Sequence, residues 1–330
     1  MSGLFVLKHV EAVRAQGVDV RVIFSQGWGD MWRQWRTLRR EGWMPDLVQL
    51  NVIQKQGLLA LWLKHRYGIP YIIVEHWSGY LPENGKYMHQ PAFKRRFAER
   101  VAEQASAILP VSNALAKAMQ ACGIRNNRWQ KINNVVDDFF FEGVESQKSK
   151  VESRKTLLHV SCFDEKAKNT SALLRGFKEL SARRNDVQLV MVGTGVDWKA
   201  SQALSSELAI PPSQILWTGE QTPEQVCEWL HRADAFVLTS RYETAAIVLA
   251  EAFASGIPIL STPVGIATEI VTPDTGLIIP QENANRPMRL SKYLERIIEL
   301  PKYDSQGKEF SAYTVGKQLK DIYTQCTVSE

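Results

Sequence analysis

Residues 235–251 of this chain read AFVLTSRYETAAIVLAE. The first five residues are typical of a buried strand, and the apolar run after residue 244 is typical of a helix. Open α/β sheets bind ligands where a strand end is followed by a helix start, whose free N–H groups suit a phosphate. Two carboxylates, Glu243 and Glu251, flank this helix start and can accept hydrogen bonds from hydroxyl groups. The stretch therefore predicts an α/β fold with a site for a phosphate-bearing, hydroxyl-rich ligand such as a nucleotide sugar.

The composition is that of an ordinary globular protein. The 330 residues are enough for two domains, and 45% of them are hydrophobic and 23% charged. No apolar run approaches the roughly 18–20 residues of a membrane span, and residues 1–9 lack the pattern of a signal peptide. The scattered cysteines form no Cys-x-x-Cys pair, which argues against a structural zinc site or a disulfide framework. These features predict a cytoplasmic protein.

Charge is distributed unevenly along the chain. Residues 1–131 hold 19 Lys and Arg against 9 Asp and Glu, whereas residues 132–330 hold 21 against 26. Seven of the ten Trp also precede residue 130. A basic, Trp-rich half suggests an anionic partner such as a lipid phosphate, a membrane surface or nucleic acid.

Strand and helix patterns alternate in two blocks. A polar stretch at residues 142–155 separates the blocks and is expected to be a linker. Strands are expected at residues 18–25, 46–51, 69–75, 107–112 and 129–134, and after the linker at 156–161, 188–192, 215–218, 235–239, 257–261 and 276–279. In the first block, helices are expected at residues 4–16, 31–41, 57–67, 93–104 and 114–121. The pattern predicts two doubly wound, Rossmann-like domains.

The first block opens with a helical pattern, whereas a doubly wound domain normally opens with a strand. Leu4, Val6, Leu7, Val10 and Val13 are spaced for one buried helix face. We therefore expect the N-terminal domain to lack its first strand, through a truncated start.

Several motifs resemble those of the retaining family 4 glycosyltransferases, which have the GT-B fold. The resemblance covers nearly the whole chain and is most specific in the second block. The spacing of Glu243 and Glu251, followed by EAFASGIPI at residues 251–259, resembles the family signature. Residues 189–195, LVMVGTG, resemble the strand and glycine loop beside the nucleotide, and residues 134–139, NVVDDF, resemble the end of the first domain.

The resemblance implies a domain division and a cleft between the domains. Residues 1–145 would form the acceptor-binding domain and residues 146–310 the nucleotide-sugar domain. Residues 311–330 would form a helix that crosses back to the first domain.

The resemblance also implies roles for residues of the second domain. Glu251 would hold the ribose hydroxyls, and Glu243 would orient the transferred sugar. Lys168 would stabilise the leaving diphosphate. The other expected donor-binding positions are Gly193, Gly195, Thr244, Ala245, Ala246 and Ile247. No metal or other cofactor is expected, because the sequence has no Asp-x-Asp where a metal would bind; the donor would be UDP- or GDP-linked.

The phosphate site departs from the family pattern. Cys162 or Phe163 stands where an Arg is expected, and Lys166 could substitute for it only as a point charge. On the acceptor side, His76 follows a strand of the first domain and would contact the sugar or the attacking hydroxyl. Trp77, Tyr80 and Asn84 are the further expected acceptor contacts.

Simpler interpretations remain open for several of these residues. Lys168 could be a solvated loop lysine, His76 a hydrogen-bonded structural histidine, and Gly193 and Gly195 ordinary turn formers. In the helical pattern at residues 31–40, Arg33, Arg36 and Arg40 could form a basic face beside Trp32 and Trp35 that contacts an anionic membrane. The alternative is a surface helix that packs Trp35 and Leu38 inward.

The predicted function is the transfer of a sugar from a nucleotide sugar to a glycan or lipid-linked acceptor in surface polysaccharide biosynthesis, at the inner face of the cell membrane. Three alternatives stay open: a non-catalytic nucleotide-sugar-binding paralogue, a GT-B epimerase and a GT-B phosphorylase. Nucleic-acid binding is not expected, because no nucleic-acid-reading motif accompanies the positive charge.

Overall fold

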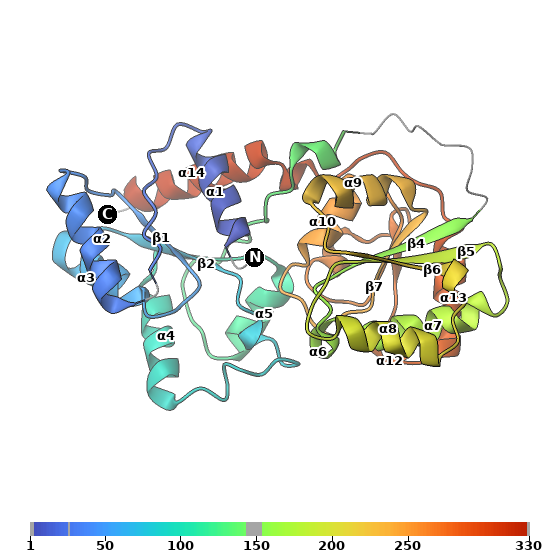
Figure 1. Ribbon diagram of the computed structural model, residues 1–330. Coiled ribbons are helices and arrows are strands. Elements are labelled where there is room, and N and C mark those ends of the chain that lie inside the picture. The colour runs from blue at the N-terminus through green and yellow to red at the C-terminus, as the bar shows by residue number, and fades with distance from the viewer. Residues whose placement is uncertain (1–2, 26, 143–153, 329–330) are drawn as a thin grey trace. The chain divides into compact units, whose positions relative to one another are not determined.

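The computed structural model describes residues 3–25, 27–142 and 154–328, which belong to two compact α/β units (Figure 1). Unit 1 comprises Met1–Val135 and Glu309–Glu330, and unit 2 comprises Val136–Lys308. The expected domain boundaries were 145/146 and 310/311. Most of the expected linker, residues 143–153, lies outside the described residues.

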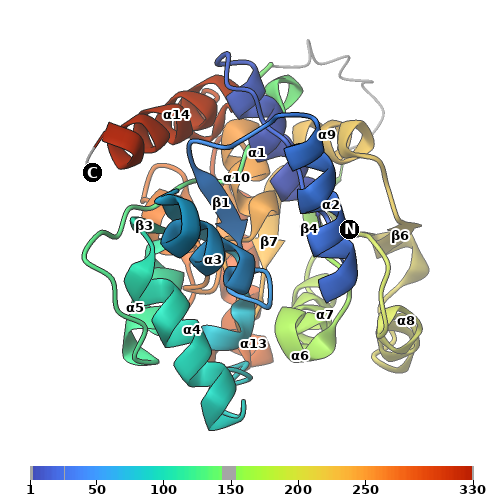
Figure 2. The same ribbon diagram turned by 90° about the vertical axis from the view of Figure 1, so that its left-hand side faces the viewer.

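Unit 1 contains a parallel sheet with the strand order β1-β2-β3. Its strands are β1 (Val48–Asn51), β2 (Tyr71–Glu75) and β3 (Ala107–Pro110). Its helices are α1 (Leu4–Arg14), α2 (Trp28–Arg40), α3 (Gly57–Tyr67), α4 (Ala92–Gln104), α5 (Asn113–Ala121) and α14 (Ala312–Val328), with a 3₁₀ turn η1 at Ser78–Tyr80. In Figure 2, α1 and α14 lie above β1 and α3, α4 and α5 lie below it.

The C-terminal helix α14 is part of the core of unit 1. Val315, Leu319 and Ile322 of α14 are fully buried in one cluster with Ala12 and Val13 of α1. The helices approach closely because Gly316 has no side chain: a Cβ at this position would lie 2.3 Å from the Ala12 carbonyl oxygen. Burial of this apolar face joins the two ends of the chain within one unit.

Two of the expected strands in unit 1 are wrong. Residues 18–25 form no strand, although Val18 and Val20 still pack on one apolar cluster and Ile23 on another. Among the described residues β1 pairs only with β2, so residues 18–25 have no neighbouring strand with which to form a ladder. Residues 129–134 contribute a single bridge, from Trp129 to Ile108 of β3. The other expected strands and helices are confirmed, with ends shifted by one to three residues.

Unit 2 contains a parallel six-stranded sheet with the order β6-β5-β4-β7-β8-β9. Its strands are β4 (Lys155–Val160), β5 (Val187–Val192), β6 (Ile215–Gly219), β7 (Ala235–Leu238), β8 (Ile259–Ser261) and β9 (Gly276–Ile278). Its helices are α6 (Glu165–Lys168), α7 (Thr170–Ser181), α8 (Trp198–Glu207), α9 (Pro223–Arg232), α10 (Ile247–Ala254), α11 (Ala267–Ile270), α12 (Gln281–Ala284) and α13 (Pro287–Ile297), with 3₁₀ turns η2 (Asp138–Phe140) and η3 (Pro212–Gln214). A further 3₁₀ turn, η4 (Lys308–Phe310), precedes α14.

The sheet of unit 2 is covered on both faces, with α9 and α10 on one side and α7 and α8 on the other (Figure 1). Its central strands are accordingly buried on both faces and read as continuous apolar runs, such as AFVL in β7. No helix in the described parts of the chain combines the length and the apolar character that crossing a membrane requires.

Candidate functional site

The strand order of unit 2 reverses between β4 and β7. The chain leaves β4 for β5 on one side and leaves β7 for β8 on the other, so these two strands flank a topological switch point. Ligands of open α/β sheets bind outside the carboxyl ends of the strands at such a point. Lys168 follows β4 and Glu243 follows β7, so the fold brings two of the predicted site residues to this edge.

Lys168 and Glu243 form a largely buried ion pair. Lys168 Nζ lies 2.5 Å from Glu243 Oε1, and the side chains are only 16% and 12% exposed. Burial lowers the pKa of Lys168, but attraction by Glu243 and their hydrogen bond outweigh it, so the net pKa is raised. The lysine is therefore held as a cation, which excludes the interpretation of Lys168 as a solvated loop residue.

Hydroxyl groups at the end of β7 hold this pair in place. Thr239 is buried, and its Oγ1 donates to the backbone carbonyls of Lys168 at 3.3 Å and Asn169 at 3.2 Å. Ser240 Oγ donates to Glu243 Oε1 at 2.8 Å. Among the described residues Glu243 Oε2 has no hydrogen-bond partner, so this oxygen can accept from hydroxyls of a ligand.

Arg241 links the same strand end to α6 and to the start of α7. Its guanidinium donates to Asn169 Oδ1 at 2.5 Å and lies 3.2 Å from Glu165 Oε1. The Glu165 carboxylate also accepts hydrogen bonds from Thr170 and Ser171 at the start of α7. These bonds and Arg241 lower the pKa of Glu165 against the opposing effect of burial. The guanidinium therefore orients the short helix that carries Lys168.

The start of α10 has a strained backbone. Ala246 has a φ of +59°, in the left-handed region that favours glycine. The preceding residue is fixed by Ile266, whose N–H donates to the Ala245 carbonyl at 3.2 Å. Gly265 makes this approach possible, since a Cβ there would lie 2.6 Å from the Ala245 oxygen. The predicted residues 244–247 are thus held in one conformation ahead of a helix N-terminus.

Glu251 lies in the second turn of α10 and is half-buried. Its negative charge is one cause, after burial, of the raised pKa of the Cys227 thiol on α9. Its side chain therefore faces α9 and is separated by two helical turns of sequence from Glu243, so the two carboxylates serve different parts of a ligand.

Gly193 and Gly195 allow two loops to approach closely. A Cβ would lie 2.0 Å from the Ser161 carbonyl oxygen at Gly193, and 1.7 Å from that of Cys162 at Gly195. Gly193 also has a φ of +116°. The loop after β5 is therefore packed against the loop after β4, which gives both glycines a structural reason.

The position where the family pattern expects an arginine is shared by two unlike side chains. Phe163 is fully buried, with its ring centroid 4.6 Å from that of Trp198, whereas Cys162 is exposed. Lys166 is also exposed. Lys168 is thus the cation that the fold holds beside Glu243.

In unit 1, His76 follows β2 and packs in an aromatic stack. Its ring centroid lies 4.0 Å from that of Phe5 and 5.9 Å from that of His9. Burial and then His9 lower its pKa well below the usual value, so the ring is neutral. Within the described residues, the buried Nε2 has no hydrogen-bond partner, which leaves it available to a ligand.

The other predicted acceptor contacts surround η1. Tyr80 is 2% exposed and packs with Trp77 and Tyr87, which favours a packing role over direct contact with an acceptor. Trp77 lies over Gly79, where a Cβ would meet its ring at 2.2 Å. Asn84 donates from Nδ2 to Ser78 Oγ at 2.8 Å, and within the described residues its buried Oδ1 has no partner.

Sequence reasoning missed the residues that position the ion pair. They are Thr239, Ser240, Arg241, Glu165 and Asn169. Ser240 and Arg241 stand in the strand-to-helix stretch quoted at the outset, so their place in the motif was a usable signal. Asn169 carries a left-handed φ of +53°, for which the asparagine itself is a weak signal.

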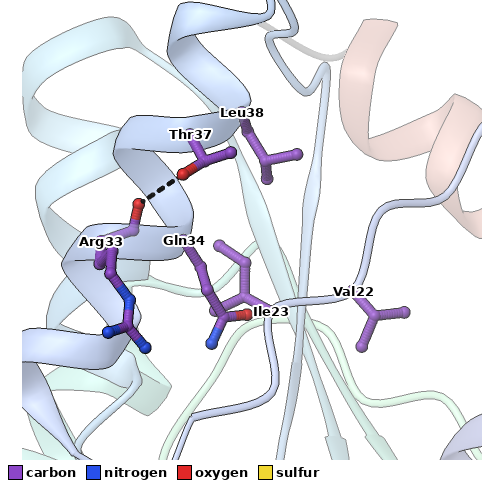
Figure 3. A pocket seen from close by; sticks show the side chains of 6 residues that line it. All are labelled: Val22, Ile23, Arg33, Gln34, Thr37 and Leu38. Atoms are coloured by element: carbon purple, nitrogen blue, oxygen red, sulfur yellow. Dashed lines mark hydrogen bonds between the residues drawn. The ribbon is translucent and has the colours of Figure 1, made fainter.

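A pocket of about 250 Å³ lies elsewhere, between α2 and the extended residues 18–25 (Figure 3). Its lining residues are Val22, Ile23, Arg33, Gln34, Thr37 and Leu38. It contains none of the predicted donor or acceptor residues, and we assign it no part in the reaction.

Comparison with known families gives two matches. The family of glycosyl transferases group 1 matches residues 142–312, and the glycosyl transferase 4-like domain matches residues 25–134. The matched ranges include the residues of both sites described above.

Among curated relatives, N-acetyl-alpha-D-glucosaminyl L-malate synthase of Bacillus anthracis is 30% identical over 182 residues, which are 53% of this chain and 46% of that protein. A putative teichuronic acid biosynthesis glycosyltransferase of Bacillus subtilis, TuaC, is 25% identical over 302 residues, 88% of this chain and 72% of that protein. The chain spans only 35% and 63% of the length of two further relatives.

Two solved structures share the fold. Sucrose-phosphate synthase from Thermosynechococcus elongatus has a TM-score of 0.80 at 16% identity, covering 100% of this chain and 94% of that one. Anabaena HepE in complex with UDP-glucose has a TM-score of 0.68 at 18% identity, covering 96% and 88%. The expected two-domain GT-B architecture is thereby confirmed.

Proposed function

The chain belongs to the glycosyl transferases group 1 family, and from this membership we propose that it transfers a sugar from a nucleotide sugar to a hydroxyl of a glycan or lipid-linked acceptor. The observation that carries the proposal is the Lys168–Glu243 pair at the switch point of unit 2. Anabaena HepE binds UDP-glucose on the same fold, and TuaC acts in the synthesis of a surface polymer.

The leaving group sets the chemical demand on this site. Negative charge grows on the nucleoside diphosphate as the glycosidic bond breaks, and it is stabilised by fixed cations and N–H dipoles. Lys168 supplies the cation, and residues 244–247 at the start of α10 supply N–H groups. With these groups in place the residues do not need a metal, so we propose a metal-independent reaction.

The carboxylates orient the donor. Glu243 Oε2 accepts hydrogen bonds from hydroxyls of the transferred sugar, while Oε1 remains bound to Lys168 and Ser240. Glu251 accepts from the two ribose hydroxyls, since an ionised carboxylate suits a vicinal diol. The donor is UDP- or GDP-linked in this proposal, and Gly193 and Gly195 shape the loop beside the nucleotide.

Transfer proceeds with retention of the anomeric configuration in this proposal, with the acceptor hydroxyl attacking from the side of the departing diphosphate. His76 contacts the sugar or that hydroxyl through its neutral ring, and Trp77 and Asn84 line the acceptor side. A neutral imidazole can accept the proton of the attacking hydroxyl, whereas an imidazolium cannot.

A nucleotide-release assay tests the proposal. The chain is incubated with UDP- and GDP-sugars and a panel of alkyl glycosides of glucose, galactose, mannose and N-acetylglucosamine, and the released nucleotide is measured. Release that depends on one donor and one acceptor, and that falls at least about 100-fold in Glu243→Gln, supports the proposal.

The same assay separates the alternatives. Turnover of the sugar without an acceptor would indicate an epimerase, and turnover that requires inorganic phosphate a phosphorylase. Nucleotide-sugar binding without turnover on any acceptor would favour a non-catalytic paralogue.

A membrane contact through unit 1 is the second part of the proposal. Arg33, Arg36, Arg39 and Arg40 are exposed on α2, while Trp35 is buried as expected for inward packing. Beside them, Trp28, Leu58, Trp62 and Tyr67 are 36–45% exposed, and Trp32 and Tyr67 pack edge-on against Trp62. Exposed aromatic side chains beside arginines suit the interface of an anionic bilayer at the inner face of the cell membrane.

Vesicle co-sedimentation tests this contact. Binding to vesicles with 30 mol % acidic lipid, about the anionic content of many such membranes, should drop by an order of magnitude when the four α2 arginines are changed to Glu. Reversal of Arg286, Arg289, Lys292 and Arg296 on α13, which are exposed in unit 2, is the matched control. Binding that survives the α2 reversal would refute the contact.

A further inference from the structure

One carboxyl group joins two loops of unit 1. Glu75, the last residue of β2, is completely buried. Its Oε1 accepts hydrogen bonds from the backbone N–H groups of His76 at 2.9 Å and Trp77 at 2.8 Å. Its Oε2 accepts from the N–H of Ile53 at 3.1 Å. Ile53 follows β1, so a single side chain ties the loop after β1 to the loop after β2.

These loops lie at the carboxyl ends of adjacent parallel strands, which is the edge where an α/β domain binds its ligand. The loop after β1 is strained, because Val52 has a left-handed φ of +66°. The loop after β2 carries His76, whose buried Nε2 has no partner among the described residues. Glu75 thus fixes the main chain on both sides of the proposed acceptor site.

The charge of Glu75 is not balanced by a cation. None of the ion pairs between described residues includes it. A buried carboxylate without a cation is expensive, and three backbone N–H groups are its compensation. Tightening of two ligand-side loops is a function that this cost supports.

We infer that Glu75 is a positioning residue for the acceptor side: its carboxylate sets the main chain of His76 and of the loop after β1 in the geometry that acceptor binding requires. The inference rests on the proposed function, because it assigns the acceptor to this edge of unit 1.

The protonation state of Glu75 provides a signature. Burial raises its pKa to about 7, against the lowering effect of the N–H groups of Trp77, Ile53 and His76. The titratable groups that face it or its neighbours are His76, His9, Tyr80 and Cys122. The two histidines have lowered pKa values and the pKa of Tyr80 is raised, so these groups stay neutral near pH 7. A protonated Glu75 has one oxygen that donates, and it therefore loses a bond to one of the loops.

The test compares Glu75→Gln with Glu103→Gln, an exposed glutamate of α4. Glutamine keeps one acceptor oxygen but presents an NH₂ group to a backbone N–H, so one loop is released. We expect kcat/KM for the best alkyl glycoside to fall about 10- to 100-fold while the donor KM stays within about twofold of wild type. The wild-type acceptor kcat/KM should lose activity below about pH 7, and Glu75→Gln should lack this acid limb.

Hydrogen exchange gives a second readout that does not need turnover. Peptides containing residues 48–58 and 71–81 should lose amide protection in Glu75→Gln at pH 8, and in wild type at pH 6 after correction for intrinsic rates. If no donor and acceptor pair is turned over, the proposed function fails and exchange alone decides on Glu75. Unchanged exchange in both loops, or an equal loss of donor and acceptor kinetics, would overturn the positioning role.

Discussion

At the scale of single residues, the account depends on the pairing of Lys168 with Glu243. The two side chains are short of solvent and 2.5 Å apart, so each is the main compensation for burial of the other. Their position was predictable in part: the sequence indicated both residues as site candidates, but gave no indication that they would contact one another. The contact depends on the parallel pairing of β4 with β7, whose residues are about 80 positions apart.

Lys168→Ala is expected to leave Glu243 without its cation. We expect a loss of about 1–3 kcal/mol in the free energy of unfolding, since a part-buried charge loses its partner, and at least a tenfold loss in nucleotide affinity. Urea unfolding and a nucleotide titration measure the two effects. Lys166→Ala, on the same short helix but exposed, should leave both unchanged, and an equal effect of the two substitutions would contradict the assignment.

A second residue-scale prediction concerns His159 of β4. It is fully buried between the Val237 carbonyl at 2.9 Å and Ser161 Oγ at 2.9 Å, and burial lowers its pKa to about 4. The folded state therefore binds the neutral ring. The stability that follows is present above pH 6.5 and is lost as the pH falls from 6.5 toward 4.

Comparison of wild type with His159→Asn isolates this contribution. The difference in unfolding free energy between them should shrink by about 3 kcal/mol between pH 7.5 and pH 4, as measured by urea titration at several pH values. A constant difference across this range would show that His159 is not the titrating group.

At the scale of elements, the loops after β4 and β5 are held together by glycines. Gly195→Ala places a Cβ 1.7 Å from the Cys162 carbonyl oxygen, so the two loops must separate. We expect a loss of about 1–3 kcal/mol by thermal or urea unfolding, together with weaker nucleotide binding. Gly29→Ala on α2, where a Cβ meets no atom within 4 Å, should change stability by less than about 1 kcal/mol. Wild-type stability of Gly195→Ala would be incompatible with the packed loops.

The elements also show where sequence reasoning failed. Residues 18–25 have the side-chain alternation of a strand, and the alternation is still expressed in which residues are buried. A strand, however, needs a neighbour with which to exchange backbone hydrogen bonds, and periodicity carries no information about that neighbour. By contrast, the strands of unit 2 were predictable because both of their faces are buried and their apolar runs are continuous.

At the scale of the whole molecule, the fold class and the two-unit division follow from the alternation of strand and helix patterns. The assignment of α14 to unit 1 had a different source, because it was expected only from family resemblance. The structure supplies its physical reason in the apolar face that α14 shares with α1. The uneven charge along the chain is also a whole-molecule property, and the vesicle experiment on α2 tests it.

The central claim is that unit 2 holds a nucleotide at the ends of β4 and β7. Calorimetric titration of UDP and GDP into wild type, Glu251→Ala and the exposed-carboxylate control Glu282→Ala tests it most directly. We predict that one of the two nucleotides binds wild type and Glu282→Ala alike and binds Glu251→Ala at least about tenfold more weakly. Absence of binding by either nucleotide, or equal binding by all three proteins, would contradict the account.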